Sequence, residues 1–328
     1  MLDFTLKTAG SLLSPPGSRA RLSILIYHRV LRRTDPLFPF EVDAGRFDAQ
    51  MKTVRDLFHI LPLSEAVFRL KNGTLPARSA CITFDDGYAD NAEVALPILQ
   101  RRRIPATFFV ADGFLDGGIM FNDRIIEIIR QNTDPLLDLT PLGLDRLPLD
   151  SFEQKRSAIS VLLSRLKYTS LEKREELLME IERIARITPN ANLMMRSEQI
   201  RELHNAGMEI GGHTVNHPIL ASIDIASSEA EIIRNRDRLQ DITGSPVRLF
   251  AYPNGKPHTD YNAEHVALIK RLGFDAAVST ARGVSTRNSD CFQLPRFTPW
   301  DLSLFRFSLR LLHNLRKNVT QPLTEAHA

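Results

Sequence analysis

The chain has 328 residues, 43% of them hydrophobic and 25% charged, and its formal net charge is +3 at pH 7. This composition is ordinary for a globular protein, and the length suits one large domain or two smaller ones. The small charge, without a basic tract interleaved with aromatic residues, argues against a nucleic-acid partner. Two cysteines, Cys81 and Cys291, provide no disulfide framework, and no apolar run reaches the ~18 residues of a membrane span.

Predicted strands and helices alternate through most of the chain. A loose arm or short helix over residues 1–20 comes first. The pattern then predicts strands at 22–28, 81–84, 106–110, 208–210, 247–252 and 274–278, and helices near 47–57, 64–71, 92–102 and 227–244. Such alternation favours an α/β barrel-like fold over separate domains.

The stretch from 113 to 195 interrupts this alternation, because it is mostly polar and helical. Residues 170–175 resemble a helix start with early acidic residues. The apolar residues that follow fit one helix face: Leu171, Leu177, Leu178, Ile181, Ile184 and Ala185. We interpret the stretch as an inserted helical cap beside the active site, where it could shape a substrate groove. A purely structural appendage is the alternative.

The C-terminal run 302–317 combines Leu and Phe residues with Arg306, Arg310, Arg316 and Lys317. A basic amphipathic helix of this kind can lie on an anionic membrane, or it can pack on its own domain. We therefore expect three parts: an arm over 1–20, a catalytic domain over 21–300 that contains the 113–195 insertion, and a C-terminal amphipathic helix and tail over 301–328.

Two short motifs carry the chemistry. Thr83-Phe84-Asp85-Asp86-Gly87-Tyr88 follows a predicted buried strand, and His213-Thr214-Val215-Asn216-His217 follows another, which Gly211 and Gly212 should end. Asp86, His213 and His217 would form a set of two imidazoles and one carboxylate, which suits zinc and other first-row metals. If the intervening residues form one helical turn, both imidazoles share a face.

The second carboxylate of the first motif is then free for another task. With Asp86 on the metal, Asp85 projects differently and could accept a proton from water as general base. A divalent metal, which we expect to be Zn²⁺, lowers the pKa of bound water and polarises a carbonyl under attack. The pair of motifs therefore predicts a metal-dependent hydrolase. A lone Asp-Asp-Gly would more often be a turn, and the His-x3-His segment lacks the Glu of a zincin protease.

These motifs resemble those of polysaccharide deacetylases of the NodB-homology type, carbohydrate esterase family 4. The resemblance runs from about Leu22 to about Pro299. It implies a distorted (β/α) barrel, with Asp85 as base and Asp86, His213 and His217 as metal ligands. The segment Ile24-Leu25-Ile26-Tyr27-His28-Arg29-Val30 is similar to the Tyr-His motif of the biofilm poly-N-acetylglucosamine deacetylases. That similarity implies His28 as the acid that protonates the leaving amine; a His that caps a buried strand is the alternative.

The chain departs from the family at a third motif, usually Arg-Pro-Pro-Tyr-Gly. Here the stretch is Phe250-Ala251-Tyr252-Pro253-Asn254-Gly255, so Ala251 takes the place of the Arg that partners the base. The backbone N–H of Asn254 could still serve an oxyanion hole. Arg296 is a candidate replacement for the missing Arg, and a surface Arg after Pro295 is the alternative.

The leading hypothesis is removal of N-acetyl groups from an amino sugar in a polysaccharide or glycan precursor, including a lipid- or nucleotide-linked sugar. A deformylase or an O-acetyl esterase would use the same metal site. A non-catalytic glycan-binding protein on the same fold is an alternative from another class, motivated by Ala251.

The start of the chain predicts the compartment. Leu12-Leu13 is too short for the apolar core of a signal peptide, and Pro15-Pro16 follows it. We therefore expect a cytoplasmic protein, and the basic C-terminal helix could add peripheral contact at the inner face of the membrane.

Overall fold

The computed structural model describes residues 2–190 and 192–317. Its centre is a parallel sheet in the order β1-β3-β4-β7-β8-β9, and β2 pairs with the start of β3. The strands are β1 Leu22–Tyr27, β2 His59–Ile60, β3 Ser79–Phe84, β4 Thr107–Val110, β7 Glu209–Gly212, β8 Leu249–Ala251 and β9 Ala276–Val278. Every residue of β1 and β3 is buried, because helices cover the outside of the sheet and its inner face encloses a core.

The sheet is curled, and a segment without regular strand structure joins its two edges. The N–H of Leu294 donates to the carbonyl of Ala277 in β9. The carbonyl of Leu294 accepts from the N–H of Ser279, directly after β9. Three residues later, Phe297 exchanges bonds with Ile24 and Ile26 of β1, at 2.7 and 3.0 Å. The closing segment 294–297 therefore completes a distorted (β/α) barrel, and the predicted fold class is confirmed.

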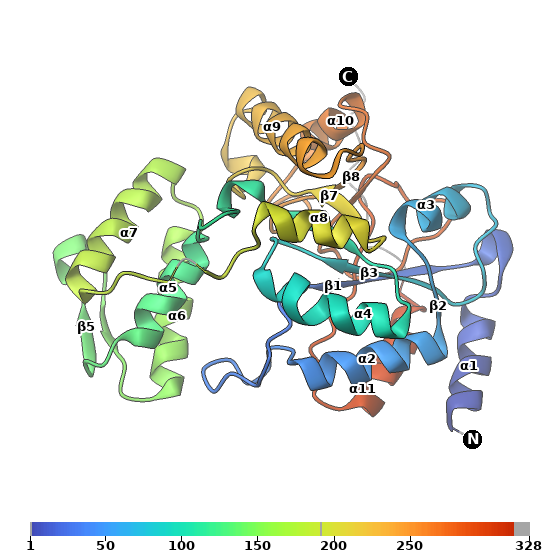
Figure 1. Ribbon diagram of the computed structural model, residues 1–328, viewed down its shortest axis with the longest axis horizontal. Helices are drawn as coiled ribbons and strands as arrows, with labels where there is room; N and C mark the ends of the chain where they lie inside the picture. The colour runs from blue at the N-terminus through green and yellow to red at the C-terminus, as the bar shows by residue number, and fades with distance from the viewer. Residues whose placement is uncertain (1, 191, 318–328) are drawn as a thin grey trace.

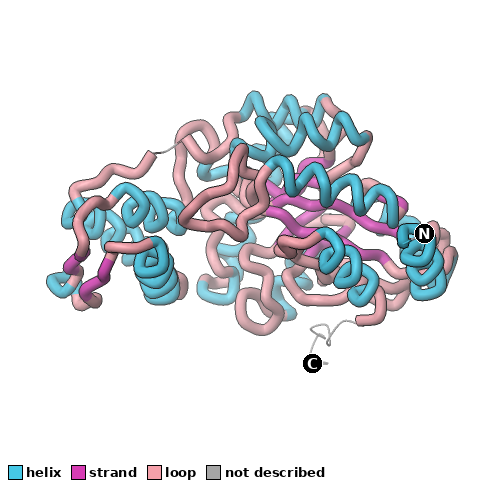
Figure 2. The backbone as a smooth tube through the Cα atoms, turned by 90° about the horizontal axis from the view of Figure 1, so that it is seen from below, coloured by secondary structure: helices cyan, strands magenta, loops and turns pink. Residues whose placement is uncertain are grey.

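Helices surround this barrel on its outer side (Figures 1 and 2). They are α1 Leu2–Leu13, α2 Ala44–Leu57, α3 Leu63–Lys71, α4 Leu96–Arg102, α8 Ser197–Asn205, α9 Ile225–Thr243, α10 Ala263–Arg271 and α11 Leu304–Asn314. Asp43 and Asp224 cap α2 and α9 by accepting a hydrogen bond from a backbone N–H in the first turn. Apolar side chains of these helices join the main core with the strands.

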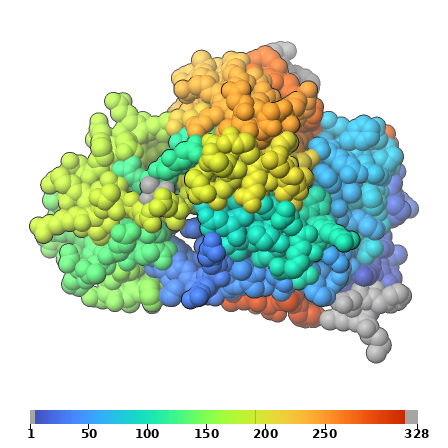
Figure 3. Space-filling view, viewed as in Figure 1, coloured from blue at the N-terminus to red at the C-terminus, as the bar shows by residue number. Residues whose placement is uncertain are grey.

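The inserted stretch forms a lobe of its own beside the barrel (Figure 3). It contains α5 Phe121–Gln131, α6 Phe152–Leu166 and α7 Leu171–Ala185, which share a separate hydrophobic core. The lobe also holds an antiparallel hairpin, β5 Leu136–Asp138 with β6 Arg146–Pro148, that the sequence pattern did not predict. A buried bond from the Tyr88 hydroxyl to Asp123 of α5, 3.0 Å long, helps fix the lobe to the body.

Both ends of the described chain pack against the barrel. The helices α1 and α11 contact each other and α2, and their buried residues Leu6, Phe307 and Leu311 belong to the main core. The C-terminal helix therefore packs on its own domain along one face. The predicted tail after residue 317 lies outside the described residues. Among the described helices, none is both long and apolar enough to cross a membrane.

Gly211 corrects one detail of the sequence analysis. Gly211 and Gly212 do not end the strand, because both belong to β7. A Cβ atom on Gly211 would lie 2.4 Å from the ring of Phe109, which is its partner in the neighbouring strand β4. The absence of a side chain at this position is what lets the Phe109 ring lie across β7.

We expect Gly211→Ala to lower the free energy of unfolding by about 1–3 kcal/mol, because the added methyl group overpacks the core against Phe109. Gly45→Ala is the matched control, since Gly45 lies in the first turn of α2 and its added Cβ would meet Asp43 at an ordinary 3.4 Å. Urea unfolding curves of both variants test this. Equal midpoints for the two would contradict it.

Candidate active site

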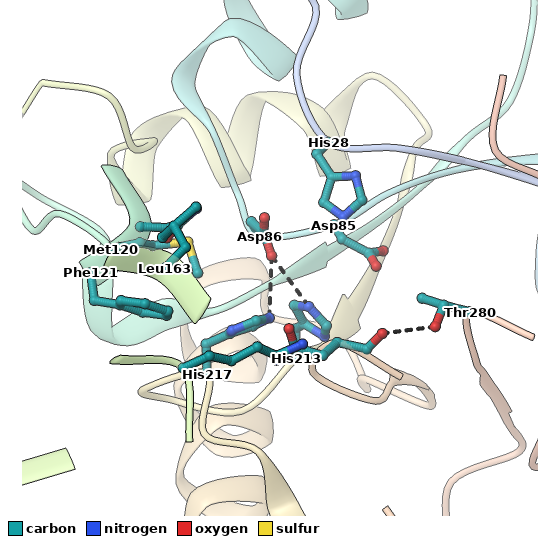
Figure 4. A pocket seen from close by; sticks show the side chains of 12 residues that line it. His28, Asp85, Asp86, Met120, Phe121, Leu163, His213, His217 and Thr280 are labelled. Atoms are coloured by element: carbon teal, nitrogen blue, oxygen red, sulfur yellow. Dashed lines mark hydrogen bonds and ion pairs between the residues drawn. The ribbon is translucent and has the colours of Figure 1, made fainter. Parts of the chain in front are cut away.

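The predicted site residues meet at the carboxyl edge of the barrel. His28 follows β1, Asp85 and Asp86 follow β3, and His213 follows β7. Parallel strands bring their carboxyl ends to the same edge, so residues far apart in sequence become neighbours. They line a cavity of about 250 Å³ (Figure 4). Its full lining is His28, Asp85, Asp86, Met120, Phe121, Asn122, Leu163, Lys167, His213, His217, Asn254 and Thr280.

A tight turn separates the tasks of the two adjacent aspartates. The N–H of Gly87 donates to the carbonyl of Asp85 at 3.0 Å, and the intervening Asp86 has a φ of 76°. This is a three-residue γ-turn with a strained central residue. The turn points the Asp86 side chain toward the two imidazoles, whereas the Asp85 side chain points toward the barrel wall.

Asp86, His213 and His217 form a compact cluster of candidate metal ligands. One carboxylate oxygen of Asp86 lies 3.4 Å from His213 Nε2 and 3.5 Å from His217 Nε2. The three ligand atoms all lie within 4.8 Å of one another. This donor set is the one that zinc and other first-row metals take, and it leaves positions for water or substrate.

The surroundings of His213 show that these atoms fit a cation. His213 Nδ1 lies 2.7 Å from the carbonyl oxygen of Ala251. A carbonyl can only accept, so Nδ1 carries a proton and Nε2 is the ring nitrogen that faces Asp86. Two electron-rich atoms approach each other favourably only around a proton or a metal ion. Burial lowers the pKa of His217 to about 4, so this imidazole is neutral at pH 7 and able to ligate.

The segment between the two histidines is a loop, so the condition of one helical turn is not met. Thr214 and His217 both have positive φ, at 65° and 50°. Two residues of α9 hold the loop: Glu231 accepts hydrogen bonds from the N–H groups of Val215 and Asn216, and Asn235 accepts from the N–H of His213. The sequence analysis missed these supports; their one signal is that polar residues occupy the inward face of a helix.

Arg296 makes the strongest contact in the site. Its guanidinium donates to both oxygens of Asp85, at 2.7 and 2.6 Å, and both side chains are at most 3% exposed. Its Nε donates to the carbonyl of Ser279 at 2.9 Å, so the fork is held in place. Bidentate pairs of this kind are short and geometrically specific. Arg296 is therefore a buried partner of Asp85, unlike a surface Arg.

This pair determines the charge of Asp85. Burial by itself raises the pKa of the carboxyl, but Arg296 and, less strongly, His213 more than offset that effect. The pKa of Asp85 therefore lies below its ordinary value, and the group is ionised at neutral pH. Arg296 comes from the closing segment, while Ala251, where the family has its Arg, offers His213 its carbonyl oxygen.

Asn254 lies at the far wall of the cavity in a second γ-turn. The N–H of Gly255 donates to the carbonyl of Pro253 at 2.6 Å, and Asn254 has a φ of 58°. The Thr280 hydroxyl donates to the Asn254 carbonyl at 2.8 Å. The Asn254 carbonyl is thereby fixed by Thr280, a residue that the sequence analysis did not single out.

His28 follows β1, lines the same cavity and is exposed. Asn91 donates to the His28 carbonyl at 2.8 Å and fixes its backbone, which leaves the imidazole at the cavity edge. His28 thus lines the same cavity as the metal-ligand cluster and Asp85. It also lines a neighbouring cavity of about 220 Å³ that lies between barrel and lobe.

The inserted lobe supplies the apolar wall of the site. Met120, Phe121 and Leu163 face the ligand cluster in Figure 4. The guanidinium of Arg174 in α7 stacks over the Phe121 ring at 4.1 Å and supports its position. The lobe therefore borders the candidate site. The sequence pattern did not indicate which residues of the lobe would line the cavity.

Comparison with known proteins agrees with this fold and site. A sequence profile described as polysaccharide deacetylase matches residues 72–134 and 171–277, together more than half of the chain. The chain therefore belongs to the polysaccharide deacetylase family.

Individual relatives are distant. YxkH of Bacillus subtilis is 20% identical over 279 residues, which cover 84% of this chain and 71% of that protein. The poly-β-1,6-N-acetyl-D-glucosamine N-deacetylase of Staphylococcus aureus is 36% identical over 75 residues, 23% of this chain and 26% of that protein. The identity with that enzyme is thus confined to a short stretch.

Solved structures share the fold. The deacetylase PplD of Streptococcus pyogenes superposes with a TM-score of 0.59 at 21% identity, covering 90% of this chain and 98% of that one. IcaB from Ammonifex degensii gives a TM-score of 0.57 at 17% identity, covering 93% and 99%. At these identities the likeness establishes the architecture of nearly the whole chain.

We expect Arg296→Gln to destabilise the protein by about 3–5 kcal/mol, because it leaves a buried carboxylate without its charge partner. In the folded variant the pKa of Asp85 should rise, since the largest effect that opposes burial is then removed. A base must be ionised, so the acidic limb of the pH profile of kcat/KM should move to higher pH. Arg282→Gln, on the exposed loop after β9, is the control. An acidic limb at the same pH as in the wild type would contradict the role of Arg296 in lowering the pKa of Asp85.

Proposed function

We propose that this protein is a metal-dependent hydrolase that removes N-acetyl groups from an amino sugar in a glycan or glycan precursor. One observation carries the proposal: a single cavity holds an Asp-His-His cluster beside a second, Arg-paired carboxylate. Hydrolysis of an amide needs one group that activates the carbonyl and another that takes the proton of the attacking water. The two aspartates, turned apart by the γ-turn, supply one group to each task.

Each residue has a role that follows from its contacts. Asp86, His213 and His217 would hold the ion, and a bound zinc ion would polarise the acetyl carbonyl and lower the pKa of water. Asp85, kept ionised by Arg296, takes the proton of the attacking water. The backbone N–H of Asn254 would donate to the oxyanion of the tetrahedral intermediate.

The acid step falls to His28, which also lines the cavity. An amine is a poor leaving group unless it is protonated, so amide hydrolysis needs a general acid as well as a base. His28 lines the cavity on an anchored backbone and is not one of the three candidate ligands. The same side chain would then be able to exchange its proton with solvent between turnovers.

Family and relatives support an acetylated sugar as the substrate. The family is that of polysaccharide deacetylases, and the short stretch of higher identity is to an enzyme named for poly-β-1,6-N-acetyl-D-glucosamine. Deformylation and O-deacetylation pass through the same kind of oxyanion and stay as alternatives. The non-catalytic alternative rested on Ala251, and it loses that motive because Arg296 pairs with Asp85. The cytoplasmic location stays a prediction.

We expect zinc-loaded protein to release acetate from N-acetylated glucosamine oligosaccharides, and a chelator to stop the release. Asp85→Asn should lower the rate by about 10²–10⁴-fold while bound zinc, measured by elemental analysis, stays near one ion per chain. Asp86→Asn should lose both zinc and activity. Loss of zinc in Asp85→Asn, or retention in Asp86→Asn, would reverse the two assignments. Faster release from O-acetylated or formylated sugars would favour the alternatives.

We expect His28→Ala to slow amide hydrolysis by about 10²–10⁴-fold without loss of bound zinc. The leaving group of an aryl acetate ester is a stable phenolate, which needs no protonation. Hydrolysis of such an ester should therefore be much less affected by the substitution. His59→Ala is the control, because His59 is an exposed histidine of β2 away from the cavity. An equal loss on amide and ester would contradict the acid role.

A further inference from the structure

The C-terminal helix α11 is fixed to the barrel through its inner face. Phe307 and Leu315 are fully buried in the main core. At the end of the helix, Arg21 donates to the Leu315 carbonyl at 2.7 Å, and Asn314 donates to the Gly283 carbonyl at 3.1 Å. These contacts set the orientation of the helix, so its outer face is presented in a defined direction.

That outer face, with the turn before it, exposes large apolar side chains. Five residues are between 42% and 58% exposed: Trp300, Leu302, Leu304, Phe305 and Leu309. We call these five residues the α11 patch. In the described part of the chain, the other nine exposed large hydrophobic residues are spread from Leu12 to Ile225. A gathering of this density on one element indicates a surface that meets a partner.

Basic side chains surround the α11 patch. Residues 300–317 contain a single acid, Asp301, and it pairs with Arg310. Arg306, Arg316 and Lys317 are exposed on the same segment. The surface is therefore both apolar and positively charged.

Trp300 connects the apolar and basic parts of this surface. The guanidinium groups of Arg282 and Arg310 lie 5.6 and 6.0 Å from the centre of its ring. Beside them is a cavity of about 130 Å³, whose basic lining includes Arg282, Arg310, His313 and Lys317. A cavity of this size and charge can receive a phosphate group, while Trp is the side chain that membrane interfaces favour.

The charge of the patch selects its occupant. A second copy of the chain, paired face to face through this surface, would bring two sets of Arg side chains together, and like charges would repel. An anionic lipid surface satisfies both properties, because it takes apolar side chains into the acyl boundary and attracts the basic rim. Because the inner face of α11 is buried against the barrel, only its outer face would meet the bilayer, and the contact would be peripheral.

We propose that the α11 patch and its basic rim form a docking surface for an anionic lipid bilayer. Arg296, the partner of Asp85, also lines the basic cavity. The closing segment 294–297 therefore contributes a residue to both the candidate active site and the basic cavity. Docking would hold the active-site cavity close to the bilayer. The inference rests on exposed residues outside that cavity and stands independently of the proposed deacetylation.

The experiment is vesicle flotation of the full chain at low salt. The vesicles contain phosphatidylcholine alone or mixed with phosphatidylglycerol. We expect binding to the mixed vesicles, weakened by added salt, and little binding to phosphatidylcholine alone. Phe305→Ser/Leu309→Ser and Arg306→Gln/Arg316→Gln should each weaken binding at least about tenfold, since one removes insertion and the other removes charge.

Matched variants on other faces are the controls. Phe68→Ser removes an exposed aromatic from α3, and Arg33→Gln/Arg287→Gln removes two exposed charges. Both should bind like the wild type, and all variants should keep its melting temperature. Absence of binding to mixed vesicles, equal binding to both vesicle types, or equal losses in patch and control variants would overturn the proposal. If the wild type is a dimer in gel filtration and Phe305→Ser/Leu309→Ser makes it a monomer, the patch binds a second copy of the chain and the lipid proposal is overturned.

Discussion

The buried ion pair between Asp85 and Arg296 is the contact on which much of this structure depends. It joins the end of β3 to the closing segment, two parts of the chain 211 residues apart. Both partners are charged and excluded from water, so neither can lose the other without a large cost. Because the same segment carries the last hydrogen bonds of the barrel, closure of the sheet and the ionisation of the proposed base are linked.

A second constraint is the strained backbone at the rim of the barrel. Asp86 and Asn254 both occupy the centre of a γ-turn with positive φ, a conformation that costs free energy in non-glycine residues. At Asp86 the turn directs the carboxylate toward the two imidazoles, and at Asn254 the carbonyl accepts from the Thr280 hydroxyl. The surrounding barrel, with buried strands on either side, supplies the rigidity that maintains these turns.

The lobe and the C-terminal helix adapt the barrel without changing its site. The lobe contributes an apolar wall with Met120, Phe121 and Leu163, and therefore bears on which substrate can approach the ligand cluster. The helix α11 covers the barrel with one face and leaves the other apolar and basic. These two additions lie at the entrance to the site and on the outer surface, where substrate selection and location can vary while the chemistry is kept.

The sequence by itself determined the barrel class and the identity of the chemical groups, because strand periodicity and short motifs are local properties. Asp85, Asp86, His213 and His217 each follow a strand, and parallel strands must bring such residues to one edge. It could not decide whether Arg296 replaced the Arg missing at Ala251. That answer depended on a segment without strand pattern closing the barrel, which only long-range backbone hydrogen bonds reveal.

The same reasoning explains the remaining differences. The loop between the histidines is held by Glu231 and Asn235 from a distant helix, so its local sequence could not decide whether a helical turn forms there. The hairpin of the lobe is short and lacks a clear alternating pattern, and its strands are stabilised by the core they cover. Which face of α11 is buried, and which is left exposed, follows from packing against α1 and α2, because amphipathicity alone does not say where each face points.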